Sequence, residues 1–115
     1  MSERSAIAIA AHPDDIEIFM SGTFMLLKEV GYELHYMNVA NGCCGTTEFD
    51  RDTIAKMRRE EAIAAAELIG AVFHEPICGD MSVFFDQATL AKIASVMRLV
   101  APEIVLTHPP ADYME

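Results

Sequence analysis

The stretch SAIAIAA, Ser5–Ala11, is apolar at every position after the serine. A strand with one solvent-facing side alternates between apolar and polar residues, whereas this stretch offers apolar side chains to both faces. It therefore predicts a central parallel strand that is covered on both sides. Because helices provide that cover, the pattern restricts the chain to α/β architectures.

The rest of the chain alternates between helix and strand patterns. Helices are predicted over residues 16–30, 51–70 and 87–100, and further strands over residues 33–40, 71–76 and 103–107. In the second helix Asp52 or Thr53 is the expected cap and Gly70 the expected end. This alternation predicts a Rossmann-like parallel sheet with right-handed crossovers, helices on both faces and the strand order 3-2-1-4.

The length of 115 residues suits one domain with a single modest core. About eight residues follow the last predicted strand, and they contain no helix pattern that would cover it. Half of a doubly wound fold has this appearance. We therefore expect residues 1–115 to be the N-terminal part of a single domain that is truncated at its C-terminal side, with bare apolar surface that would permit a homo-oligomer.

Charge and hydropathy exclude several classes of partner. The formal net charge of −10 argues against nucleic acid and anionic membranes, which both attract basic surfaces. No apolar run approaches the roughly 20 residues that span a bilayer, and no charged-then-apolar leader opens the chain. The expectation is a soluble, cytoplasmic protein with a small-molecule partner.

The three cysteines form neither a disulfide framework nor the paired spacing of a zinc knuckle. Cys43 and Cys44 are adjacent, within the predicted loop Asn41–Asp50. Such a pair is compatible with a redox or soft-metal site. The favoured interpretation is that they are small buried residues in a tight loop.

The chemistry of the sequence is concentrated where two predicted strands end. The first strand runs into AHPDD (residues 11–15) and the fourth into THPPAD (residues 107–112). In the order 3-2-1-4 these strands are neighbours across the point where strand order reverses, which is where α/β sheets bind ligands. Both strands therefore deliver a His-Pro pair and a carboxylate into the same crevice.

Two interpretations of AHPDD remain open from the residues alone. In the first, Asp14 caps the following helix, Glu17 completes a capping box and Pro13 only stiffens the turn. In the second, Pro13 holds His12 extended, so that the imidazole projects from the strand end. His12 and Asp15 can then converge on one metal ion, with Asp14 free to act as a base. Zinc suits this set, and Fe²⁺ or another divalent ion would also accept it.

In this context AHPDD resembles the PIG-L/LmbE family of metal-dependent N-deacetylases, which act on N-acetylglucosamine-type sugars. Further similarities follow in the same order along the whole chain: Ser21-Gly22-Thr23, the helix segment RREEAIAAAELIG (residues 58–70) and THPPADYME (residues 107–115). The resemblance implies a zinc-dependent hydrolase that removes an acetyl group from an amino sugar.

Residue by residue, the resemblance implies that His12 and Asp15 bind zinc and that Asp14 is the general base. It also makes Arg58 a substrate contact, the alternative being a solvated helix arginine beside Arg59. The family's third ligand is a histidine in an Asp-His pair, which would be expected to begin where this sequence reaches Glu115. Met114 stands where many relatives carry a histidine that helps to stabilise the oxyanion.

The remaining histidines and Asp112 receive supporting roles. We expect His108 and Asp112 to orient neighbouring groups rather than to react. Direct contact of His108 with metal or substrate remains the open alternative. His35 and His74 lie within predicted strands and are expected to be core or surface residues.

Two other functions compete with hydrolysis. A receiver-like α/β domain would use the acidic pair to hold a divalent metal without hydrolysis, but it needs a lysine after its last strand, and the final lysine is Lys92. A dinucleotide-binding module would carry G-x-G-x-x-G after the first strand, which is absent here. With two expected ligands where a catalytic zinc site has three, residues 1–115 alone are expected to be inactive.

Overall fold

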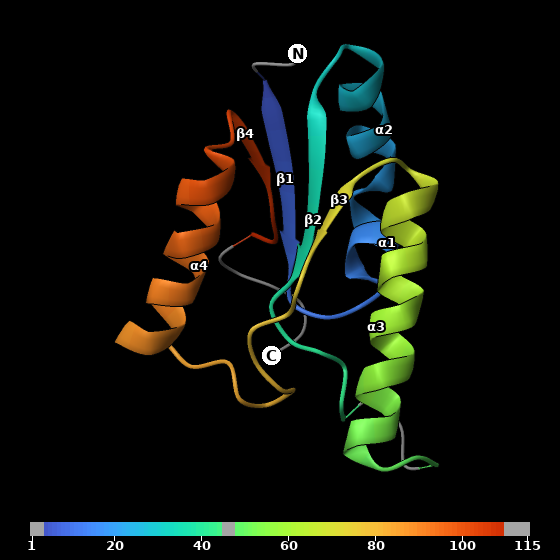
Figure 1. Ribbon diagram of the computed structural model, residues 1–115, viewed down its shortest axis with the longest axis vertical. Coiled ribbons are helices and arrows are strands. Elements are labelled where there is room, and N and C mark those ends of the chain that lie inside the picture. Colours follow the sequence, from blue (N-terminus) through green and yellow to red (C-terminus); the bar gives the residue numbers. More distant parts are fainter. Residues whose placement is uncertain (1–3, 45–47, 110–115) are drawn as a thin grey trace.

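Four parallel strands form one sheet in the computed structural model, which describes residues 4–44 and 48–109. The strands are β1 (Ser5–Ala10), β2 (Glu33–Asn38), β3 (Val72–His74) and β4 (Ile104–Leu106). The helices are α1 (Asp15–Phe19), α2 (Ser21–Glu29), α3 (Arg51–Leu68) and α4 (Gln87–Val100). The sheet order is β3-β2-β1-β4, which confirms the predicted order (Figure 1).

Strand β1 is the centre of the sheet, as its apolar pattern predicts. It pairs with β2 from Ser5↔Glu33 to Ala10↔Asn38 and with β4 over Ala6 to Ala8. The side chains of Ala6, Ile7 and Ala8 are fully buried. Both edges of β1 are thus hydrogen-bonded and both faces are covered.

The helices are divided between the two faces of the sheet (Figure 1). Helices α1, α2 and α3 lie on one side and enclose the main core, whose largest fully buried members include Phe24 and Tyr36. Helix α4 lies on the other side and has no buried residue, and Val105 of β4 is 42% exposed. This division follows from right-handed crossovers, because the connection from β3 to β4 runs in the opposite direction across the sheet.

The single helix predicted over residues 16–30 is in fact two helices. Met20 separates α1 from α2, with φ −123° and ψ −12°. The hydroxyl of Ser21 donates to the carbonyl of Glu17 at 2.8 Å, and such a side-chain bond competes with the helical ladder. The helical pattern of the sequence did not predict this break, and the side chains that the two helices and Met20 bury are Ile16, Met20 and Phe24.

Helix α3 begins one residue before the predicted caps. Asp50 has an extended backbone, and its carboxylate accepts from the Thr53 N–H at 2.7 Å, whereas Asp52 already lies within the helix. The prediction of Asp52 or Thr53 as the cap is therefore wrong. In the described part of the chain, α3 included, no helix combines the length and apolarity that crossing a bilayer requires.

Three hydrogen-bonded polar side chains form a row on the face of the sheet opposite the main core. His35 is buried in β2, and its Nε2 lies 2.8 Å from Oε1 of Glu33 while its Nδ1 lies 2.8 Å from Nε2 of His74. Because a carboxylate only accepts, Nε2 of His35 carries a proton, and Nδ1 of a neutral His35 accepts from His74. Burial and the neighbouring His35 lower the pKa of His74 from its ordinary 6.5.

This pKa shift predicts acid-sensitive stability. The unfolded chain takes up a proton on His74 at the ordinary pKa of 6.5 and the folded chain only at a lower pH, so the free energy of unfolding should fall as pH drops through 6.5 toward the lowered pKa of the folded chain. The variant His74→Gln should lose this part of the pH dependence in urea unfolding. His12→Gln, a change to a half-exposed histidine, should retain it, and equal slopes for the two variants would contradict the assignment.

Candidate metal and catalytic site

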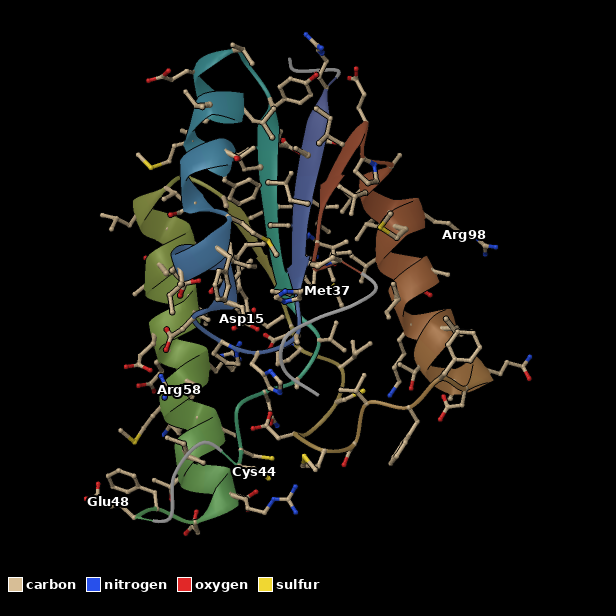
Figure 2. The ribbon with its side chains drawn as sticks, turned by 180° about the vertical axis from the view of Figure 1, so that it is seen from behind. Asp15, Met37, Cys44, Glu48, Arg58 and Arg98 are labelled. Atoms are coloured by element: carbon tan, nitrogen blue, oxygen red, sulfur yellow. The ribbon has the colours of Figure 1, made fainter. Side chains whose placement is uncertain are left out.

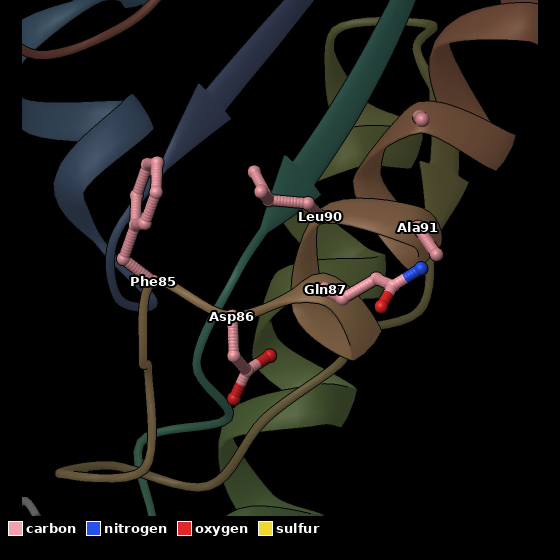
Figure 3. A pocket seen from close by; sticks show the side chains of 6 residues that line it. Phe85, Asp86, Gln87, Leu90 and Ala91 are labelled. Carbon is pink, nitrogen blue, oxygen red and sulfur yellow. The ribbon is translucent and has the colours of Figure 1, made fainter.

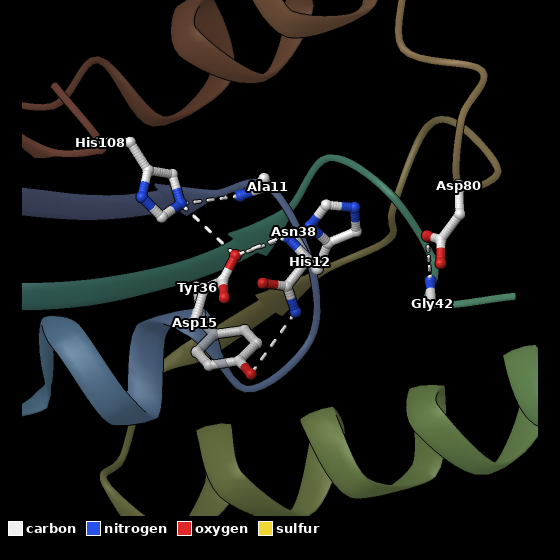
Figure 4. Close-up of polar contacts among 8 residues, drawn as sticks. All are labelled: Ala11, His12, Asp15, Tyr36, Asn38, Gly42, Asp80 and His108. Carbon is white, nitrogen blue, oxygen red and sulfur yellow. Dashed lines mark hydrogen bonds and ion pairs between the residues drawn. The ribbon is translucent and has the colours of Figure 1, made fainter. Parts of the chain in front are cut away.

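The turn after β1 brings His12 and Asp15 together. The backbone N–H of His12 donates to Asp15 Oδ2 at 3.0 Å, and the Nδ1 atom of the His12 ring lies 3.8 Å from the same oxygen (Figure 4). The Asp15 N–H donates in turn to the His12 carbonyl at 3.3 Å. A ring nitrogen and a carboxylate oxygen thus lie side by side at the carboxyl end of the central strand.

Asp14 faces a different partner. Its carboxylate accepts from Arg58 Nη1 at 2.9 Å and makes no hydrogen bond to the start of α1. Glu17 does not complete a capping box, because its carboxylate accepts from the hydroxyl of Tyr36 at 2.7 Å. The capping interpretation of this motif is therefore wrong. The backbone at Asp14 is left-handed, with φ +80°, a conformation that glycine adopts freely and that aspartate adopts at a modest cost.

Arg58 reaches this turn from α3, as Figure 2 shows from the opposite side. Its Nη1 also contacts Glu61 Oε1 at 3.2 Å, and its side chain is 30% exposed. Arg59 points elsewhere and pairs with Glu75. The structure thus separates the two adjacent arginines and places only Arg58 beside the AHPDD turn. Its role as a substrate contact remains a prediction.

His108 comes from the loop after β4 and reaches the same turn. Its Nε2 accepts from the Ala11 N–H at 3.1 Å and lies 3.5 Å from Asp15 Oδ2 (Figure 4). An Nε2 atom that accepts carries no proton, so the contact with Asp15 is a close approach of two acceptors rather than an ion pair. The ring also packs edge-on against Phe19. Asp112, Met114 and Glu115 lie outside the described residues, so their predicted roles have no structural counterpart here.

The geometry of His12 and Asp15 fits part of a metal site. Two donors at about 2.0–2.1 Å from a tetrahedral metal are separated by roughly 3.3 Å. The 3.8 Å between Nδ1 of His12 and Oδ2 of Asp15 needs only a small side-chain adjustment to reach that value. The donor set, one imidazole and one carboxylate, suits Zn²⁺ or Fe²⁺. The Nε2 atom of His108 already accepts a hydrogen bond from the Ala11 N–H, so in this arrangement it is not available as a third metal ligand.

Two residues at this edge were missed by the sequence analysis. Asn38 ends β2 with only 2% of its surface exposed, and its Nδ2 donates to the Tyr36 hydroxyl at 3.5 Å. Its Oδ1 is buried without a hydrogen-bond partner among the described residues. Burial, followed by the contact with Glu17, raises the pKa of Tyr36. The available signal for Asn38 was an amide side chain at the carboxyl end of a strand beside the central one, the edge where such sheets bind ligands.

The cysteine pair is only partly buried as expected. Cys43 is 6% exposed, but Cys44 is exposed, so the prediction of two small buried residues is wrong for the second. Arg51 donates to Cys43 Sγ at 3.2 Å and lowers the pKa of that thiol. Partial desolvation of its sulfur, followed by the contact with Cys43, raises the pKa of the neighbouring Cys44.

A separate pocket lies at the start of α4, and no residue of the AHPDD turn lines it (Figure 3). Its lining is apolar apart from Asp86 and Gln87. Asp86 is already engaged as the helix cap, because its carboxylate accepts from the Thr89 N–H at 2.8 Å. The pocket therefore offers no group that is arranged for catalysis.

Comparison with known proteins gives a family match over most of the chain. The family model described as PIG-L, GlcNAc-PI de-N-acetylase, matches residues 7–115. That range contains every residue of the AHPDD turn together with Arg58 and His108.

Two curated relatives have different activities. The chain is 34% identical over 117 residues to 4-oxalmesaconate hydratase of Pseudomonas putida KT2440, a match covering 96% of this chain and 45% of that protein. It is 31% identical over 110 residues to diacetylchitobiose deacetylase of Thermococcus kodakarensis, covering 93% of this chain and 41% of that protein. The chain thus spans less than half the length of both relatives.

A solved structure agrees with the fold. The crystal structure of GalB, the 4-carboxy-2-hydroxymuconate hydratase from Pseudomonas putida KT2440, superposes with a TM-score of 0.81 at 33% identity. The match covers 96% of this chain and 50% of that one.

The close packing around Gly42 yields a stability prediction. Gly42 has φ +81°, and a Cβ atom there would lie 3.1 Å from Cγ of Arg58 and 3.2 Å from Cγ of Pro13. Gly42→Ala should therefore lower the free energy of unfolding by about 1–3 kcal/mol. The control is Gly22→Ala in α2, where a Cβ meets nothing within 4 Å, and it should stabilise by about 0.5–1 kcal/mol. Urea unfolding measures both, and equal effects would contradict this account of the turn.

Proposed function

Because the chain belongs to the PIG-L family, we propose that it forms part of a metal-dependent hydrolase that removes the acetyl group from an N-acetylglucosamine-type amino sugar. Enzymes of this family are generally metal-dependent, and a diacetylchitobiose deacetylase is among the relatives of the chain. The products would be acetate and a free amino sugar.

The observation that carries this proposal is the separation of two adjacent carboxylates. Asp15 turns toward the His12 ring, whereas Asp14 turns toward Arg58. Hydrolysis of this kind needs one carboxylate to help hold a cation and a second one to accept a proton. The turn after β1 provides one carboxylate for each purpose.

His12 and Asp15 would hold the metal ion, for which zinc is our proposal and Fe²⁺ the alternative. Bound there, the ion would supply Lewis acidity, which polarises an acyl oxygen and makes a water molecule acidic near neutral pH. We expect a third protein ligand outside the described residues, after Glu115, where the family resemblance places a histidine.

Asp14 is the proposed general base. Its side chain is 51% exposed, so water and substrate can reach it, and Arg58 fixes the position of Oδ2. Asp14 would take a proton from the attacking water and deliver it to the amine nitrogen as the C–N bond breaks. The same carboxylate thus returns to its ionised state when acetate and amine have formed.

Arg58 would contact the substrate. A guanidinium carries five N–H donors. In Arg58, Nη1 donates to both Asp14 and Glu61, so the donors on the other two nitrogens can bind sugar hydroxyl groups. In this arrangement one side chain orients both the base and the substrate. His108 would support the site by holding the Ala11 backbone beside Asp15.

A second candidate function is the hydration of an unsaturated carboxylic acid. The observation that favours it is the 34% identity to a hydratase, against 31% to the deacetylase. Asp14 would again accept a proton from water, and Arg58 would pair with a substrate carboxylate. We place hydrolysis first because the matching family model describes a de-N-acetylase.

We further propose that residues 1–115 are the N-terminal part of one domain rather than a complete enzyme. The support is that the chain spans 45% and 41% of its two relatives. Activity should therefore be measured on the 115 residues and, in parallel, on a chain that includes the residues encoded after Glu115.

One prediction of the proposed mechanism concerns the division of roles between His12 and Asp14. In the active chain, Asp14→Asn should lower acetate release from an N-acetylglucosamine derivative by about 10²–10⁴-fold while the metal stays bound. His12→Ala should lose both metal and activity. Metal content after dialysis and acetate formation are the two readouts.

Three results would overturn these assignments. Equal metal loss in both variants would mean that the roles of Asp14 and Asp15 are exchanged. Hydration of an unsaturated dicarboxylate without any acetate release would replace the deacetylase by the second candidate. Full activity and stoichiometric metal in the 115 residues alone would contradict a third ligand after Glu115.

Another prediction of the proposed mechanism compares the adjacent residues Arg58 and Arg59. Arg58→Ala should raise KM and lower kcat, because it removes donors to the substrate and frees Asp14, with a combined loss in kcat/KM of about 10²-fold. Arg59→Ala, which breaks the exposed pair with Glu75 and the cation–π contact with Phe73, should leave both constants nearly unchanged because neither partner belongs to the AHPDD turn. A lower kcat with unchanged KM in Arg58→Ala would show that Arg58 only positions Asp14.

A further inference from the structure

A second group of chemically active side chains lies at the same end of the sheet, in the loops that follow β2 and β3. The two loops are joined by a bridge between Ala40 and Cys78 and by the bond from the Asn41 N–H to the Cys78 carbonyl, at 3.0 Å. This pairing brings Cys43 and Cys44 against Asp80. None of these three residues belongs to the site proposed above.

Asp80 is a fixed acceptor between the two loops. It is 6% exposed, and its Oδ1 accepts from the Gly42 N–H at 2.8 Å while its Oδ2 accepts from the Cys44 N–H at 2.9 Å. Each carboxylate oxygen has two lone pairs, so one on each oxygen remains for another partner. The backbone therefore holds the carboxylate in place without using all of its capacity.

The two thiols lie beside this carboxylate. The sulfur of Cys43 is 3.9 Å from the sulfur of Cys44, and it accepts from the Asp80 N–H at 3.3 Å and from Arg51 at 3.2 Å. N–H groups directed at a sulfur stabilise the thiolate form, which is the form that binds metals. Cys44 is exposed, so an ion can approach from solvent.

We propose that Cys43, Cys44 and Asp80 bind a thiophilic divalent cation such as Zn²⁺ or Cd²⁺. Within the described residues they are the one group of three His, Cys, Asp or Glu side chains whose ligand atoms all lie within 4.8 Å of one another. Two sulfurs at about 2.3 Å from a tetrahedral zinc are separated by roughly 3.8 Å. The observed 3.9 Å matches that spacing and far exceeds the roughly 2.05 Å of a disulfide.

The local charges support a divalent ion. Two thiolates and one carboxylate carry three negative charges, which a divalent cation and the guanidinium of Arg51 would together neutralise. Bound between the loops, the cation would fix the segment from Gly42 to Cys44. This inference is independent of the proposed deacetylase, because it uses neither His12 nor Asp15.

The test is a titration of the metal-free protein with Cd²⁺ in the presence of a reductant that contains no thiol. Thiolate coordination produces an ultraviolet charge-transfer band, which an imidazole–carboxylate site does not give. The band should saturate at one equivalent. Cys44→Ser should reduce its amplitude to about half, because one of two thiolates is lost, and should weaken affinity at least tenfold.

Two control variants make the test specific. Cys78→Ser removes the cysteine that is not in the group, and His12→Ala removes a ligand of the other proposed site. Both should titrate like the parent protein. Circular dichroism checks that Cys44→Ser is folded, which is expected because Cys44 is exposed.

The proposal is overturned if the parent protein gives no band, or if the band persists at full amplitude in the double variant Cys43→Ser/Cys44→Ser. It is equally overturned if Cys78→Ser loses as much of the band as Cys44→Ser does. An intact band in a protein that releases no acetate would count against the proposed deacetylase function only, and it would leave the cation site of Cys43, Cys44 and Asp80 supported.

Discussion

The double burial of β1 is the constraint on which the rest of the structure depends. This strand is hydrogen-bonded to β2 on one edge and to β4 on the other, and Ala6 and Ala8 face the main core with no exposed surface. Methyl side chains at these positions let α1 and α2 approach the sheet closely. Because the strand order reverses beside β1, the connections on its two sides cover opposite faces, and the loops at its carboxyl end are the ones that meet.

That meeting explains why His108 lies where it does. The ladder between β1 and β4 ends at Ala8↔Leu106, and beyond it the two chains diverge. The N–H of Ala11 therefore has no partner on β4, and a half-buried N–H without one is costly. The Nε2 of His108 accepts from it and thereby comes within 3.5 Å of Asp15. Its place in the site thus follows from a backbone requirement rather than from coordination.

The sequence predicted the fold well because the fold depends on periodicity. The strand order agrees with the one expected from alternating strands and helices joined by right-handed crossovers, and α4, Gln87–Val100, has the predicted bounds. The break at Met20 was not predictable from that pattern, because it coincides with a single bond from the Ser21 hydroxyl. In the site, the residues of AHPDD were found, but their roles remained ambiguous. Asp14 suits a cap as well as a base, and the missing cap bond and the contact with Arg58, which no sequence pattern shows, exclude the side-chain cap and leave the base as our proposal.

The left-handed backbone at Asp14 is the clearest case of local strain at this site. A glycine there would relieve about 1–2 kcal/mol but would leave Arg58 without its partner in the turn. The surroundings hold the strained conformation, because Gly42 has no side chain and so lets Arg58 pack close enough to reach Asp14. The same Gly42 donates its N–H to Asp80. One small residue after β2 therefore packs against Pro13 and Arg58 of the AHPDD site on one side and binds Asp80, beside Cys43 and Cys44, on the other.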